Sequence, residues 1–121
     1  MNARATLFSA ALGFSLVACA TALNDEVVSA VERRAEHNGR TVTLSGELRE
    51  RKGFYNLHSR DGQECIGLLL TDQQRVEYRS SVGRRVTLTG TLEAEGCGGN
   101  NMCVEHLCAP TILTGVSAAT L

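Results

Sequence analysis

A strict alternation of apolar and polar residues is the clearest pattern in this chain, and it occurs twice. Residues 39–48 and 83–92 share the sequence G-R-x-V-T-L-x-G-x-L. Because side chains of a strand point alternately to the two faces of a sheet, each copy predicts a strand with one buried face and one solvated face. The glycine within each copy, Gly46 or Gly90, predicts a bulge or a sharp bend. Two bent strands of one design predict a small closed barrel, with buried faces formed by Val42, Leu44, Leu48, Val86, Leu88 and Leu92.

Three more strands and two helices complete the predicted domain. A short amphipathic helix is expected over 25–37, with Asn24 as its N-cap and a stop at Asn38-Gly39. A second helix begins after Thr71, which forms a capping box with Gln74, and ends at Gly83. Residues 25–115 are predicted to form one domain, and 116–121 a flexible tail. The predicted strands cover 41–49, 54–58, 64–70, 85–93 and 103–113, and Pro110 makes part of the last strand an edge or a bend.

The N-terminus carries the features of an export signal. Arg4 supplies positive charge, and the apolar run 7–17 is too short to span a membrane stably and ends in small residues. Leu16-Val17-Ala18-Cys19 is similar to the bacterial lipobox, in which the cysteine becomes the acylated first residue. The resemblance implies a signal peptide over 1–18, a lipidated tether over 19–24 and palmitate-type acylation of Cys19. Ordinary cleavage after Ala20, giving a soluble periplasmic or secreted protein, is the alternative.

The number of cysteines supports lipidation independently. The chain has 5 cysteines, and an odd cysteine in an exported protein requires an explanation. If Cys19 carries lipid, four remain, which is enough for two disulfides in an oxidising compartment. Ala20 is not the aspartate that marks inner-membrane retention in lipoproteins. The resemblance therefore implies an outer-membrane lipoprotein that faces the periplasm.

The predicted order, three strands, a helix and two strands, resembles the OB-fold, a five-stranded Greek-key barrel. The likeness covers about residues 39–113 and rests on element order and on the two G-x-x-V-T-L-x-G stretches. It is similar in kind to small exported OB-fold proteins of bacterial envelopes. The expected fold is therefore mainly β, an OB-fold-like barrel with one helix between strands three and four and a short N-terminal helix.

Two disulfides are predicted among the four remaining cysteines. In a hairpin that turns near Asn100, Cys97 and Cys103 lie opposite one another. In an OB-fold, strands three and five are parallel neighbours, which would bring Cys65 to Cys108. The rival pairing is Cys65–Cys103 with Cys97–Cys108.

The sequence contains no motif that is typical of catalysis or of metal binding. A zinc set of Cys97, Cys103, His106 and Cys108 is conceivable, but it has no C-x-x-C spacing, and exported cysteines more often bond to one another. No nucleophile elbow or phosphate-binding glycine loop occurs. The histidines at 37, 58 and 106 are interpreted as surface or half-buried residues. We therefore expect no enzyme activity, cofactor or metal.

The OB-fold resemblance implies a ligand face on strands two and three and the loops beside them. Single-strand binding needs aromatic platforms beside positive charge. The net charge of −1 and the few aromatic residues argue against nucleic acid. The candidate ligand face is Arg49, Arg51, Lys52, Tyr55, Asn100 and Asn101.

The sequence thus favours a non-catalytic envelope lipoprotein that recognises a protein, glycan or small ligand at the membrane surface. A structural accessory subunit of an envelope complex is the first alternative. An inhibitor that inserts the loop 96–103 into a target cleft is another. A single-stranded nucleic-acid-binding domain is the last.

Overall fold

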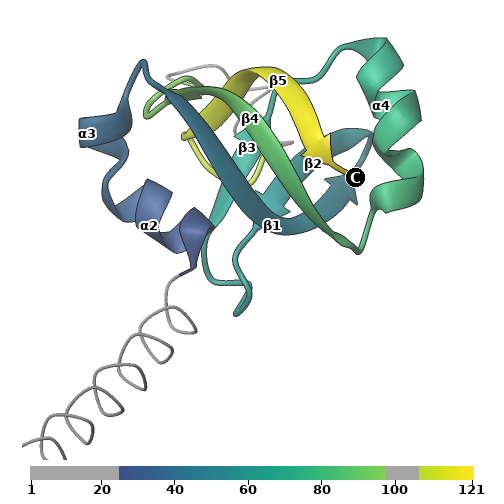
Figure 1. Ribbon diagram of the computed structural model, residues 1–121, viewed down its shortest axis with the longest axis horizontal. Helices are drawn as coiled ribbons and strands as arrows, with labels where there is room; N and C mark the ends of the chain where they lie inside the picture. The colour runs from purple at the N-terminus through teal and green to yellow at the C-terminus, as the bar shows by residue number, and fades with distance from the viewer. Residues whose placement is uncertain (1–24, 98–106) are drawn as a thin grey trace, which may run out of the picture.

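The computed structural model describes residues 25–97 and 107–121 (Figure 1). Within these ranges the protein is mainly β, with one five-stranded sheet and a few short helices. The strands are β1 (Thr41–Arg51), β2 (Phe54–His58), β3 (Cys65–Leu68), β4 (Arg85–Glu93) and β5 (Ile112–Thr120). The helices are α2 (Glu26–Glu32), α3 (Arg34–His37), α4 (Asp72–Tyr78) and the short 3-10 helix η1 (Arg79–Ser81). The predicted leader and tether, Cys19, Asn24, Asn100, Asn101, Cys103 and His106 lie outside the described residues.

The sheet closes on itself. Its strands are hydrogen-bonded in the order β1-β2-β3-β5-β4, and β4 also pairs with β1, so every strand has two neighbours. All pairs are antiparallel except β3 and β5, which are parallel as expected. Figure 1 shows α2 and α3 at one end of the sheet and α4 at the other. Closure leaves no strand edge among these five to be protected from intermolecular pairing.

The two copies of the repeated stretch lie side by side as β1 and β4. Leu44 pairs with Leu88 at the centre of the antiparallel register, and both side chains are buried. On the outer face, the hydroxyl groups of Thr43 and Thr89 are hydrogen-bonded at 2.8 Å. This arrangement confirms the predicted division into a buried and a solvated face, except that Val42 is only half-buried.

Each mid-strand glycine faces a valine of the other copy. Gly46 pairs with Val86, and Val42 pairs with Gly90. A Cβ on Gly46 would lie 2.8 Å from the carbonyl oxygen of His58, and one on Gly90 would lie 2.7 Å from that of Thr114. The pairing of β4 with β5 shifts register between Thr89 and Thr91, on either side of Gly90. The glycines therefore permit close backbone approach, and at Gly90 the predicted irregularity is present.

Helix α4 lies between β3 and β4, and the predicted capping box is present. The hydroxyl of Thr71 accepts from the backbone N–H of Gln74 at 3.1 Å, and the Gln74 side chain accepts from the N–H of Thr71 at 3.0 Å. Tyr78 is the buried residue of this helix, whereas Val76 is 63% exposed. α4 ends at Tyr78 and η1 at Ser81, both before the predicted helix end at Gly83, which itself adopts a φ of 87°.

The N-terminal helix differs from the prediction in its cap and its continuity. Arg33 leaves the helical conformation, with a φ of −107° and a ψ of 25°, and separates α2 from α3. Asp25 is the N-cap instead of Asn24, and its Oδ1 accepts from the N–H groups of Val27 and Val28 at 2.9 and 3.3 Å. Val27 and Ala30 are buried within the main core, so α2 covers one end of the sheet.

Replacing Asp25 with alanine should destabilise the protein by about 2 kcal/mol, at the upper end for loss of an N-cap. The reason is that Asp25 also accepts, through Oδ2, the backbone N–H of Arg60 at 2.8 Å, which ties α2 to the β2–β3 turn. Urea unfolding would measure the change. Asp25→Asn is the matched control and should lose less than half as much, because asparagine also caps helices well.

The C-terminal assignment from sequence is wrong. The last strand is β5 (Ile112–Thr120), and residues 107–111 of the strand predicted over 103–113 precede it. β5 includes most of the segment expected to be a flexible tail. The small residues after Gly115 continue to pair with β4, where Ser117 lies opposite Thr89 and Ala118 opposite Leu88. Pro110 precedes the strand, so its missing backbone N–H removes no hydrogen bond between β5 and its neighbours. Small side chains fit here because main-chain pairing, not side-chain burial, holds this end of β5.

The observed bounds of two other strands, β1 and β3, also differ from the predicted ones. β1 continues through Arg51, so the charged turn before β2 is reduced to Lys52 and Gly53, both with positive φ. β3 ends at Leu68 rather than residue 70 and begins at Cys65. The longer β1 places more of the arginine-rich segment on the sheet itself, where its side chains alternate between faces.

Candidate ligand groove and disulfide corner

The predicted ligand face is only partly assembled. Arg49 and Arg51 line a groove of about 300 Å³ on the outside of the sheet, together with Glu50, Asn56, His58 and Cys108. Lys52 is exposed in the turn beside it. The other predicted members, Asn100 and Asn101, lie outside the described residues.

Tyr55 does not present an aromatic surface on this face. It is 4% exposed, and its hydroxyl donates to the carbonyl oxygen of Arg75 in α4 at 2.9 Å. Its inward position follows from β2, on which Tyr55 and Leu57 point into the core and Phe54 points outward. Phe54 is half-buried, and the guanidinium carbon of Arg75 lies 5.5 Å from its ring centroid. The edge of Tyr55 instead contributes to a pocket of about 480 Å³ between the β1–β2 turn and α4, lined also by Glu50, Gly53, Arg75, Arg79 and Val82.

The segment before β5 packs across the outside of β2 and β3. The side-chain oxygen of Asn56 accepts from the backbone N–H of Cys108 at 3.0 Å, which explains why Asn56 is buried. Leu107 and Ile112 form a second small core with Cys97, against which Phe54 packs. Gly67 makes this approach possible, because a Cβ there would lie 3.0 Å from Leu107. The chain itself therefore covers part of the face predicted to bind ligand, and the groove lies between this segment and the β1 residues that line it.

A second pocket adjoins the groove through Arg49. It has a volume of about 260 Å³ and is lined by Glu47, Arg49, Ser59, Arg60 and Arg85. Arg49 Nε forms a short ion pair with Glu47, and both side chains remain substantially exposed. Three arginines against one carboxylate make this the more cationic of the two hollows.

The disulfide corner lies at one end of the groove. Cys65 and Cys108 are joined, with their Cα atoms 6.2 Å apart, in the pairing that the resemblance implied. Cys97 is also disulfide-bonded, while its predicted partner Cys103 lies outside the described residues. The rival pairing is excluded, because Cys65 bonds to Cys108. Cys97 and Cys108, two members of the zinc set considered from the sequence, are therefore disulfide-bonded rather than free thiols.

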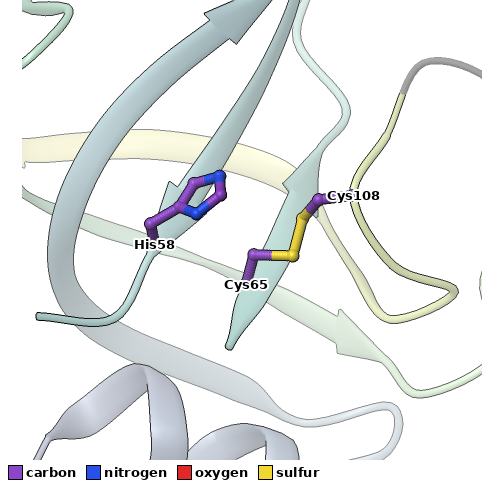
Figure 2. A group of neighbouring side chains, drawn as sticks. All are labelled: His58, Cys65 and Cys108. Carbon is purple, nitrogen blue, oxygen red and sulfur yellow. A yellow bond between two sulfur atoms is a disulfide. The ribbon is translucent and has the colours of Figure 1, made fainter. Parts of the chain in front are cut away.

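His58 lies beside this disulfide, which the sequence did not indicate. It ends β2 and pairs with Cys65 across the β2–β3 ladder (Figure 2). Burial lowers the pKa of His58, the positive charge of Arg49 lowers it further, and Glu47 opposes the shift. His58 Nδ1 is buried and has no hydrogen-bond partner among the described residues. The register of the β2–β3 pair decides that His58 lies opposite Cys65. The sequence did not determine this register, because the connection between the two strands is six residues long.

Acidification should weaken the fold through His58. Its folded-state pKa lies below the unfolded value of 6.5, so the unfolded chain binds the proton more readily. The stabilisation is fully present above pH 6.5 and is lost as pH falls from there through the folded-state pKa. Urea midpoints measured between pH 7.5 and pH 5 would show the slope. His58→Gln should flatten it, and His37→Gln, at the end of α3, should retain it.

Comparisons of the chain with protein-family models, with curated proteins and with solved structures found no match. In the ranges 25–97 and 107–121, no helix combines the length and the apolar character needed to cross a membrane. The site must therefore be interpreted from its own residues.

Proposed function

We propose that this protein is a non-catalytic binding module with an OB-fold-like Greek-key barrel. The closed order β1-β2-β3-β5-β4, with α4 between β3 and β4, supports the OB assignment. In that fold the outside of strands two and three and the adjacent loops bind ligands. The groove lined by Arg49, Arg51 and His58 occupies the open part of this face.

The ligand class follows from the two hollows that meet at Arg49. That junction is the observation on which the proposal depends. Four arginines line the two hollows together, against the two carboxylates of Glu47 and Glu50. Guanidinium groups bind carboxylates and phosphates in a fixed planar geometry. The best fit is an acidic glycan or an acidic peptide segment.

Binding should be tested by chemical-shift perturbation of the labelled domain. Three probes would be used: an acidic envelope glycan fragment, a glutamate-rich peptide and a single-stranded oligonucleotide. We expect the glycan or the peptide to shift the signals of Arg49, Arg51 and Asn56, and Arg49→Ser/Arg51→Ser to remove these shifts. Arg34→Ser, on the exposed surface of α3, is the matched control. Shifts with none of the probes, or shifts that survive in the double variant, would refute this site. A response to the oligonucleotide alone would favour the nucleic-acid alternative.

The envelope address is part of the same proposal. Cys65, Cys97 and Cys108 are all disulfide-bonded, which supports an oxidising compartment. If Cys103 completes the second bond as predicted, Cys19 is left for acylation. Intact mass with and without reduction would test both points: acylation at Cys19 should add lipid mass, and reduction should add four hydrogens. An unacylated chain that begins at residue 21 would favour the secreted alternative.

A structural accessory role has one observation in its favour. Three large apolar side chains lie exposed around α4: Leu69 before it is 57% exposed, Val76 within it 63%, and Val82 after it 40%. Exposed apolar residues of this kind are common at protein contacts. Copurification from detergent-solubilised envelopes in a fixed stoichiometric complex that Val76→Asp disrupts would favour this role over glycan binding.

A further inference from the structure

The disulfide corner contains three side chains of a zinc-binding set. His58, Cys65 and Cys108 come from the end of β2, the start of β3 and the segment before β5. One potential ligand atom from each lies within 4.8 Å of the other two. We propose that reduction of the Cys65–Cys108 disulfide converts this corner into a zinc site with ligands His58, Cys65 and Cys108. This proposal is independent of the glycan or peptide site.

The side chain of His58 is the first support. Its Nδ1 atom is buried, and nothing in the described part of the chain bonds to it, although buried polar atoms nearly always have partners. Figure 2 shows the imidazole ring of His58 beside the Cys65–Cys108 disulfide. Coordination of a metal by Nδ1 would satisfy this atom, so we assign Nδ1 as the ligand nitrogen.

The distances require little rearrangement. Zinc binds thiolate sulfur at about 2.3 Å and imidazole nitrogen at about 2.0–2.1 Å, so tetrahedral ligand atoms stand roughly 3.4–3.8 Å apart. One ring nitrogen of His58 and the two sulfurs lie within 4.8 Å of one another, so these atoms need to approach by no more than about 1.4 Å, and the two sulfurs must separate once their bond is broken. The Cα atoms of Cys65 and Cys108, 6.2 Å apart, permit this by side-chain rotation. Three protein ligands leave the fourth position to water.

Charge and electrons balance. A dithiol reductant transfers two electrons and two protons to the disulfide and becomes a disulfide itself, leaving Cys65 and Cys108 as thiols. Zinc binding then releases two protons as both sulfurs become thiolates. The two thiolates neutralise the ion, so the nearby Arg49, itself paired with Glu47, faces a site of no net charge. Disulfide and zinc thus become alternative links between β3 and the segment before β5.

The test uses the full chain carrying Cys19→Ser, which removes that thiol and any acyl chain. The protein would be reduced with a phosphine, freed of reductant without oxygen, and titrated with Zn²⁺ against a chromophoric chelator. We expect one ion per chain. Cobalt in its place should give the thiolate charge-transfer absorption of two sulfur ligands. His58→Gln should weaken binding by more than the roughly 10- to 100-fold that is typical of losing an outer-shell partner.

Matched variants separate this site from the other cysteines. Cys97→Ser/Cys103→Ser should bind zinc as the parent does, whereas Cys65→Ser/Cys108→Ser should not bind it. Circular dichroism of oxidised His58→Gln would verify that the variant folds. If the reduced parent unfolds, zinc should restore its spectrum. Failure to restore it, unchanged affinity in His58→Gln, or zinc retained by Cys65→Ser/Cys108→Ser would each overturn the proposal.

Discussion

Valine at position 46 is expected to destabilise the fold by about 3 kcal/mol or more, the upper range for overpacking a close-packed core. The Cβ alone would lie 2.8 Å from the carbonyl oxygen of His58 and 2.9 Å from Cγ2 of Val27. The first neighbour is backbone of β2 and cannot rotate away, and the second anchors α2. Denaturant unfolding of Gly46→Val, with Gly46→Ala as the milder step, would measure the change.

Gly53→Ala is the control for this prediction. Gly53 has a φ of 84°, and nothing lies within 4 Å of an added Cβ, so only backbone strain opposes the substitution. The left-handed conformation costs a non-glycine residue about 1–2 kcal/mol. If Gly46→Val were no worse than Gly53→Ala, close approach between β1 and β2 would not be what requires glycine at position 46.

Loss of the Cys65–Cys108 bond has the second large expected effect. The bond closes a loop with a sequence separation of 43 residues, for which the chain-entropy relation gives about 4 kcal/mol. Cys65→Ala/Cys108→Ala should therefore lower the free energy of unfolding by about that amount, measured in urea under oxidising conditions. The small domain has few other means of compensating such a loss.

The matched control distinguishes this bond from its neighbour. Cys97→Ala/Cys103→Ala should destabilise the chain less, because the predicted Cys97–Cys103 loop is far shorter and closes less chain entropy. Equal losses from the two double variants would show that chain entropy does not determine the ranking.

The strands and caps that the sequence predicted correctly are those with strong local signals. The two copies of G-R-x-V-T-L-x-G-x-L became β1 and β4 because alternation alone determines which face is buried. The capping box of Thr71 and Gln74 could likewise be predicted, because its two residues lie three positions apart in the sequence. β5 was misplaced because its small residues carry no apolar alternation, and its strand conformation is imposed by pairing with β4. Long-range pairing of this kind leaves little trace in a local pattern.

The candidate site could be predicted only where topology fixed it. The parallel pairing of β3 with β5 brings the segment before β5, which carries Cys108, to Cys65 at the start of β3, and the two cysteines are bonded as the resemblance implied. The OB-fold resemblance implied that Tyr55, in the second strand, lies on the ligand face. Its side chain instead points inward to meet the carbonyl of Arg75. A shift of one residue along a strand reverses every side chain, and the sequence did not determine that register for β2.

The antiparallel pair of β1 and β4 is pseudo-symmetric, because the two strands carry the same sequence pattern. About the central pair Leu44 and Leu88, each copy sets its valine against the glycine of the other. The same rule would be satisfied by β1 of one molecule against β1 of another. Antiparallel pairing of β1 between two partly unfolded molecules therefore needs no complementarity beyond that of the native β1–β4 pair, and the high effective concentration within one chain opposes it. Concentrating partly denatured protein should consequently favour dimers that are paired through β1.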